Sequence, residues 1–154
     1  MAGNPCILEV NKSIRIGVMN GHYLNELITQ SYNRQNGENK QILCCRHLLE
    51  QQSMYPVYPS TLMPLDISRI GTLAWRETPD IHIIATDKMK FIHNVDGVLF
   101  IAPGPLALGN GGGSYVRLTI YPHQRAGEEE MAANDLSKRC KAELISLYTC
   151  LFLF

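Results

Sequence analysis

A glycine-rich segment is the first part of this sequence that could carry chemistry. It runs from Ala102 to Ser114 and reads APGPLALGNGGGS. The backbone N–H groups of such a segment can hold a phosphate where a strand leads through the loop into a helix N-terminus. Here the segment leads into Tyr115–Tyr121, whose alternating side chains predict a strand. We therefore expect a tight connection between two strands, with phosphate binding by Gly109–Gly113 as a weaker alternative.

The histidines and cysteines form no recognised metal or nucleophile motif. No HxH, HExxH or GHxH pattern occurs, and none of the five cysteines lies in a CxxC pair. His82 stands in an apolar run, where we expect a partnered histidine on a sheet surface. Cys44 and Cys45 lie in an apolar helical stretch without the positive charges that stabilise a thiolate. We predict no catalytic residue, no metal and no other cofactor.

The composition and charge of the chain argue against a dedicated nucleic-acid-binding protein. The 154 residues are 45% hydrophobic and carry 14 basic and 14 acidic side chains, so the net charge is zero. Nucleic-acid binders usually show a basic excess, because neutralising phosphates supplies most of their affinity. We expect DNA to be bound at most weakly, or through another protein of a complex. The absence of a signal peptide and the unpaired cysteines favour a cytosolic or nuclear protein.

Hydrophobic periodicity predicts a layered α/β protein in which helices and strands interleave early and strands dominate late. The expected strands are Cys6–Val10, Ile14–Met19, Ile81–Ala85, Val98–Ala102 and Tyr115–Tyr121, the first two as a hairpin. One helix is expected from His22 onward, and two more are expected over Lys40–Gln52 and Leu65–Trp75. A last, amphipathic helix is expected over Glu128–Tyr148. In this last helix acidic residues precede basic ones, as the helix dipole favours.

The segment Tyr55–Pro59, of sequence YPVYP, is the candidate binding site. Its two prolines exclude a regular helix and fix an extended shape. Aromatic rings on such a rigid segment lose little entropy on docking. We therefore take Tyr55, Pro56, Tyr58 and Pro59 as candidate partner-binding residues. The alternative is that both tyrosines pack between the sheet and a helix.

Several segments, taken in order, resemble a known family. They include Thr78–Ile84 (TPDIHII), Asp96–Gly104 (DGVLFIAPG) and Gly112–Leu118 (GGSYVRL), after Ile16–Leu24 and Leu48–Pro59. Over roughly Cys6 to Tyr121 they are similar to the C-terminal half of the phosphoesterase-like domain in accessory B subunits of replicative DNA polymerases. The B subunits of polymerase α are the most similar.

The resemblance implies an α/β (α+β) fold, the C-terminal portion of a calcineurin-like metallophosphoesterase sandwich in which two sheets lie between helices. Residues 5–122 would form this partial domain. Residues 123–154 would be a helical tail that does not match the family, whose chains continue with a further strand. Active relatives carry a GHxH metal motif where this chain has Ala85–Lys88, and a protonated lysine repels cations.

The function implied is that of a non-catalytic accessory or scaffold subunit, or a fragment of one, in the DNA polymerase alpha–primase complex. It would act in the nucleus at the initiation of DNA replication. Its partners would be the C-terminal region of the catalytic subunit of DNA polymerase alpha and, indirectly, primase. The alternative is a metal-dependent phosphoesterase related to archaeal polymerase small subunits. Because the upstream half of the sandwich is missing, we expect exposed sheet surface that a partner completes.

Overall fold

The computed structural model describes residues 3–21, 23–31, 37, 39–61, 64–109, 111–122 and 136–147. His22, His123 and the first part of the predicted C-terminal helix, residues 128–135, lie outside the described residues.

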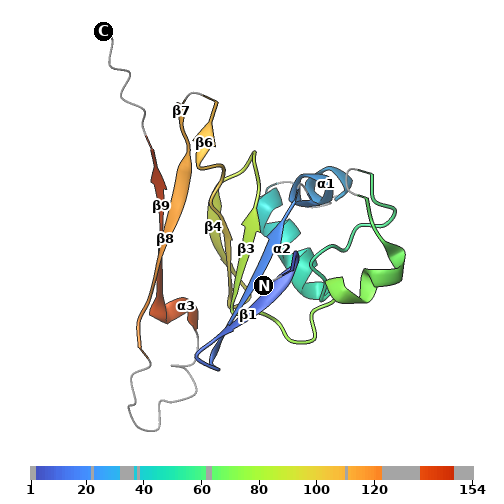
Figure 1. Ribbon diagram of the computed structural model, residues 1–154, viewed down its shortest axis with the longest axis horizontal. Coiled ribbons are helices and arrows are strands. Elements are labelled where there is room, and N and C mark those ends of the chain that lie inside the picture. Colours follow the sequence, from blue (N-terminus) through green and yellow to red (C-terminus); the bar gives the residue numbers. More distant parts are fainter. Residues whose placement is uncertain are drawn as a thin grey trace.

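A five-stranded mixed sheet forms the centre of the molecule (Figure 1). Its strands lie in the order β1-β2-β3-β5-β4. Strands β2, β3 and β5 are parallel, and β1 and β4 run antiparallel at the two edges. Their bounds are β1 Cys6–Val10, β2 Ile14–Asn20, β3 Ile81–Ala85, β4 Phe91–Val95 and β5 Val98–Ala102. The predicted hairpin and the two predicted strands of the sheet centre are confirmed.

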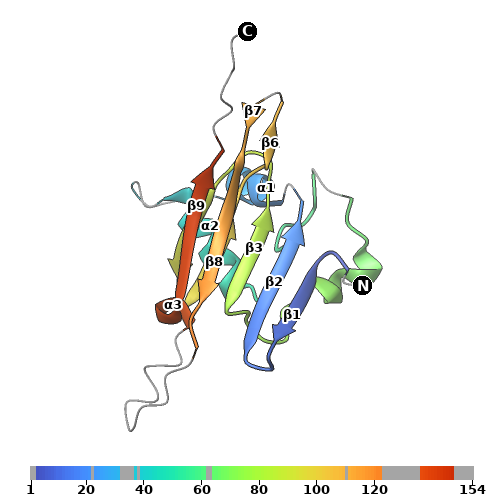
Figure 2. The same ribbon diagram turned by 60° about the vertical axis from the view of Figure 1, so that its left-hand side comes forward.

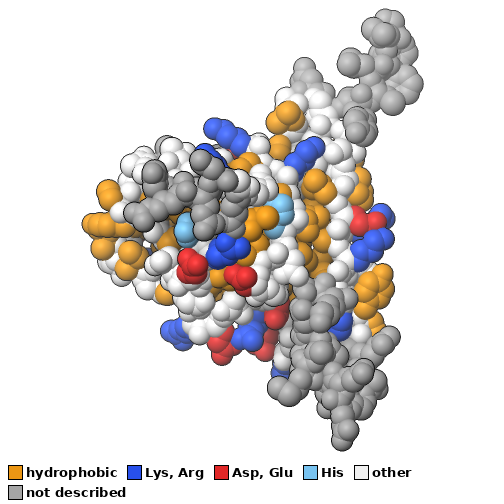
Figure 3. All heavy atoms as spheres, turned by 180° about the vertical axis from the view of Figure 1, so that it is seen from behind, with side chains coloured by type: hydrophobic (Ala, Val, Ile, Leu, Met, Phe, Trp, Pro, Cys, Tyr) orange, Lys and Arg blue, Asp and Glu red, His pale blue; other side chains and the backbone are white. Residues whose placement is uncertain are grey.

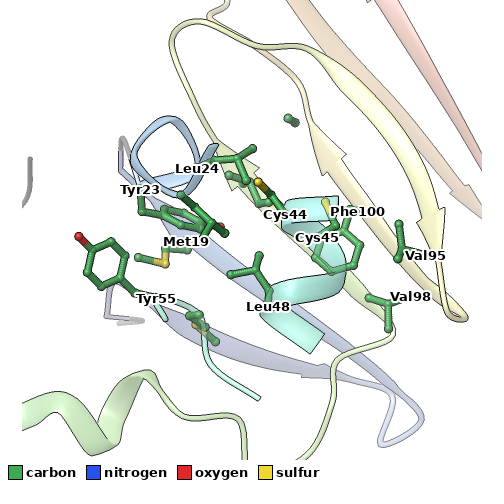
Figure 4. Close-up of a cluster of buried hydrophobic side chains, with 14 of the residues drawn as sticks. Met19, Tyr23, Leu24, Cys44, Cys45, Leu48, Tyr55, Val95, Val98 and Phe100 are labelled. Carbon is green, nitrogen blue, oxygen red and sulfur yellow. The ribbon is translucent and has the colours of Figure 1, made fainter. Parts of the chain in front are cut away.

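Two helices, α1 (Tyr23–Gln30) and α2 (Lys40–Glu50), cover one face of this sheet. The Asn39 side chain caps α2 by accepting a hydrogen bond from Gln41 N at 2.9 Å. A 3-10 helix, η1 (Ile67–Leu73), lies beside them in the predicted Leu65–Trp75 stretch. Figure 4 shows side chains of both helices, of Tyr55 and of strands β2 and β5 converging in the core between these layers.

A second, two-stranded sheet covers part of the other face. It consists of β8 (Ser114–Ile120) and β9 (Cys140–Ser146), paired antiparallel. Its inward side chains, among them Val116, Leu118 and Ala142, pack against a second apolar cluster that includes Ile81 and Ile101. Figure 2 shows the two layers, with β1 at the open edge of the large sheet. The predicted mixed α/β fold with two sheets is therefore confirmed.

The predicted helix over Glu128–Tyr148 is wrong for the part that the structure describes. Only α3 (Leu136–Arg139) is helical, and β9 follows it directly. Every residue of β9 has a partner on β8, from Ser114 opposite Ser146 to Ile120 opposite Cys140. The described part of the tail therefore adds a strand beside β8. Strand β4 was not predicted, because His93 and Asn94 interrupt its apolar pattern.

Candidate functional site

The carboxyl ends of the parallel strands form the place where sheets of this kind usually bind ligands. A hollow of about 350 Å³ lies there. Its walls are the loop after β3, the loop after β5, the glycine-rich segment and the end of β9. The residues that contribute most of its polar groups are Asp87, Lys88, Lys90, Ser114 and Ser146.

Several polar groups of this hollow are hydrogen-bonded within the chain. Lys90 Nζ donates to Ser146 Oγ at 3.3 Å, and Ser114 Oγ donates to the Pro103 carbonyl at 2.7 Å. The N–H groups of Gly113 and Ser114 donate to backbone carbonyls. Among the described residues, no group of three or more His, Cys, Asp or Glu side chains could hold a metal ion. The described walls of the hollow therefore offer neither a set of metal ligands nor a ring of free backbone donors.

Close backbone packing accounts for the glycines around the hollow. Strands β6 (Ala107–Leu108) and β7 (Gly111–Gly112) make a small hairpin, as the predicted strand-to-strand connection requires. A Cβ on Gly112 would lie 2.1 Å from the Leu147 carbonyl oxygen, and one on Gly113 would lie 1.9 Å from that of Pro105. Only glycine fits where two backbones approach so closely. Phosphate binding is not needed to explain this composition.

His82, the second residue of β3, is fully buried and has structural contacts. Its Nε2 is 3.2 Å from the Tyr23 hydroxyl, and its ring makes edge contacts with Trp75 and Phe100 at 5.3 and 5.7 Å between centroids. Its other side lies against Gly17, where a Cβ would come within 2.6 Å of Nδ1. Burial lowers the pKa of His82 to about 4. The prediction of a partnered histidine within the sheet is confirmed.

The remaining candidates for chemistry are structural too. His93 stacks on Phe91 at 4.9 Å, and its Nε2 lies 3.1 Å from Gln41 Oε1. Cys44 and Cys45 are fully buried. Burial, together with the neighbouring Cys44, raises the pKa of Cys45 to about 12, so its thiol stays protonated.

The two tyrosine rings of the Tyr55–Pro59 connector differ in burial. Tyr55 is 5% exposed and meets the Tyr23 ring edge-on at 6.3 Å, as the packing alternative requires. Tyr58 is 70% exposed, and Pro59 is exposed beside it. Pro56 is half-buried. We call the exposed pair Tyr58 and Pro59 the connector tip; it lies beside a hollow of about 470 Å³ that Leu27 also lines.

A buried carboxylate accepts hydrogen bonds from residues on both sides of the connector tip. Glu26 of α1 is fully buried and accepts a hydrogen bond from the Tyr55 hydroxyl at 2.6 Å. It also accepts from the Thr61 backbone N–H and, at 2.8 Å, from the Thr61 hydroxyl. Ser60 Oγ lies 2.7 Å from the Tyr55 hydroxyl, and burial and the bond to Glu26 raise the pKa of Tyr55 to about 12. Sequence reasoning missed Glu26, because its pattern is that of an ordinary helix surface residue.

The sequence of the chain matches a known protein family over most of the large sheet. The profile of the family of B subunits of DNA polymerases alpha and epsilon matches residues 1–93. The chain belongs to this family. The B-subunit resemblance inferred from the motifs is therefore confirmed.

Two curated relatives show what share of a family member this chain represents. The DNA polymerase alpha B subunit of Schizosaccharomyces pombe is 26% identical over 153 residues, covering 94% of this chain and 27% of that protein. The protein of the same name from Mus musculus is 28% identical over 129 residues, covering 79% of this chain and 21% of that protein. The chain thus spans about a quarter of the length of these relatives. Within its described part, no helix has the length and apolar character to cross a bilayer.

Proposed function

We propose that this member of the B-subunit family is a non-catalytic accessory unit of the DNA polymerase alpha–primase complex, acting in the nucleus at the initiation of replication. The observation that carries the proposal is the connector tip, an exposed tyrosine and proline held on a buried carboxylate anchor. The names of the relatives support the choice of complex. Several polar groups in the hollow after β3 are hydrogen-bonded within the chain, and its described walls hold no set of metal ligands. Both observations support a role without catalysis.

The connector tip is the proposed contact with the C-terminal region of the polymerase alpha catalytic subunit, through which primase would be reached. Tyr58 offers a large ring to a partner, and the Glu26 anchor holds the flanking residues before binding. Little conformational entropy is then lost on association. Figure 3 shows Lys and Arg side chains mingled with Asp and Glu on one face of the molecule, which supports at most weak direct contact with DNA.

The test is co-expression with the C-terminal region of the catalytic subunit, followed by size-exclusion chromatography and affinity measurement. We expect a stoichiometric complex, and we expect Tyr58→Ala to weaken it about tenfold or more, the scale of a central aromatic anchor. Stability should be unchanged, since Tyr58 makes little contact with its own chain. Tyr121→Ala, at an exposed ring at the end of β8, is the matched control.

The outcomes separate the alternatives for this ring. Lost stability with unchanged affinity would show that Tyr58 serves packing. Loss of affinity in both variants would point to a nonspecific effect. A folded chain that forms no complex at all would refute the scaffold role.

A further inference from the structure

Strand β1 is an open edge with little protection. It ends the order of the large sheet, and its sequence CILEV contains one charged residue and no proline. Natural proteins usually shield such edges with lysines, prolines or bulges, because free backbone groups recruit other strands. Here three large apolar side chains are also exposed, Ile7 at 41%, Leu8 at 42% and Val10 at 38%.

The hydrogen-bond pattern shows which backbone groups face outward. The Val10 carbonyl accepts from Ser13 N across the hairpin turn, so Val10 turns its backbone groups toward β2. The N–H and C=O of Asn20 both bond the side chain of Asn4, on the β1 side of β2. Along an antiparallel strand, the backbone N–H and C=O groups of successive residues point alternately to the two sides. Those of Cys6, Leu8 and Val10 therefore bond β2. The N–H and C=O groups of Ile7 and Glu9 therefore point to the open edge.

The side chains of β1 also divide into two faces. Leu8 and Val10 lie opposite Ile16 and Ile14, which belong to the second apolar cluster. Ile7 and Glu9 lie on the other face, toward η1. On that side a groove of about 660 Å³ runs between β1 and η1, and its charged lining residues are Arg69 and Arg76.

The groove carries positive charge at the end of β1 where Ile7 lies. Arg76 has no ion-pair partner among the described residues, and Arg69 reaches Asp66 only at 3.7 Å with 81% of its side chain exposed. The nearby carboxylate Glu77 is paired with Arg15. An incoming strand would therefore match the groove best if it placed a carboxylate opposite Ile7.

We propose that β1 pairs with β1 of a second copy of this chain, antiparallel and centred on Leu8. In this register Ile7 of each copy faces Glu9 of the other, and their outward N–H and C=O groups bond across the new pair. Each Glu9 then enters the groove that Arg69 and Arg76 line in the other copy. On the opposite face Leu8 meets Leu8, and Val10 meets Cys6, which covers the exposed apolar side chains. The two five-stranded sheets join into one continuous sheet.

The elements around β1 lie mostly away from the middle of the proposed pair. Figure 2 shows β1 at the margin of the sheet, with β8 and β9 over the far side and η1 near the start of β1. A twofold axis through Leu8 would place the two η1 helices at opposite ends of the new pair. The contact is small compared with permanent interfaces, and the dimer should be weak and reversible.

The first experiment traps the register with a disulfide. Cα atoms of a non-hydrogen-bonded antiparallel pair lie about 4.5 Å apart, within the range that a disulfide spans. In the full chain carrying Cys6→Ser, Leu8→Cys should give a cross-linked dimer under mild oxidation with oxidised glutathione. The Cys6→Ser parent and Tyr115→Cys, at an exposed site on β8, should not. No cross-link at Leu8→Cys, or equal cross-linking at Tyr115→Cys, would overturn the proposal.

The second experiment tests the charge match in solution by sedimentation across a wide concentration range. Glu9→Lys should weaken the dimer about tenfold, because it places like charges together in both symmetric grooves. Arg76→Glu added to Glu9→Lys should restore association. Monomer at every concentration would overturn the proposal. So would a dimer insensitive to Glu9→Lys, or an edge that binds another polypeptide in preference to a second copy.

Discussion

The buried imidazole of His82 makes the stability of this protein depend on pH in a way that can be calculated. Its folded pKa is about 4, lowered by burial, whereas an unfolded histidine titrates near 6.5. Between these values the unfolded chain binds the extra proton, so the free energy of unfolding falls as the pH falls. The contribution is fully present above pH 6.5 and is lost through the window from 6.5 to about 4.

The size of the effect follows from the two pKa values. One pKa unit corresponds to about 1.4 kcal/mol, so the full window is worth about 3 kcal/mol, of which about 2 kcal/mol is lost between pH 7 and pH 5. Restricting the measurement to pH 5–7 avoids most of the titration of carboxylates. The rings around His82 are those of Tyr23, Trp75 and Phe100, and none of them carries a charge in this range.

Urea unfolding followed by fluorescence gives the measurement, because Trp75 is the single tryptophan and its ring lies 5.3 Å from that of His82. We expect the wild-type free energy of unfolding to fall by about 2 kcal/mol from pH 7 to pH 5, and by much less in His82→Gln. Subtracting the two profiles removes the contribution of His93, whose pKa burial also lowers. Equal slopes in the two proteins, or an NMR titration that puts the pKa of His82 near 6.5, would refute the reasoning.

Two further predictions concern packing. Gly113→Ala should cost more than 2 kcal/mol, roughly the scale of overpacking, because its Cβ would overlap the Pro105 carbonyl; Gly71→Ala, with open space around its Cβ, should stay within about 0.5 kcal/mol. Equal thermal midpoints for these two variants would contradict the close-approach account. Glu26→Ala should cost about 3 kcal/mol in urea unfolding, because it removes the carboxylate that accepts hydrogen bonds from the buried Tyr55 and from Thr61. An unchanged urea midpoint would show that Glu26 does not anchor the connector.

Local sequence was enough to predict the parallel centre of the sheet but not its last strand. Ile81–Ala85 and Val98–Ala102 are short runs of mostly apolar residues, which is typical of strands buried on both faces. Residues 136–147 are ambiguous. Leu136, Cys140 and Leu144 have helical spacing, while Lys141 and Glu143 alternate with apolar neighbours as in a half-exposed strand. Pairing with β8, a contact between distant segments, decides between the two.

The sequence predicted the segment Tyr55–Pro59 as a candidate site, but not which of its two tyrosines is exposed. Tyr55 and Tyr58 are the same residue type, and each stands directly before a proline. No local pattern distinguishes them. The difference arises because Glu26, from a helix some thirty positions earlier, bonds the hydroxyl of one ring and leaves the other outside.

Packing accounts for the residues that first suggest chemistry. Gly17 makes room for His82, Gly113 makes room for the Pro105 carbonyl, and Cys45 is a buried neutral thiol. None of these residues then needs a ligand to explain it. Packing leaves unexplained the exposed ring of Tyr58 and the apolar open edge of β1, because exposing either to water brings the monomer no benefit. Contact with other polypeptides, as proposed above for each, would account for both.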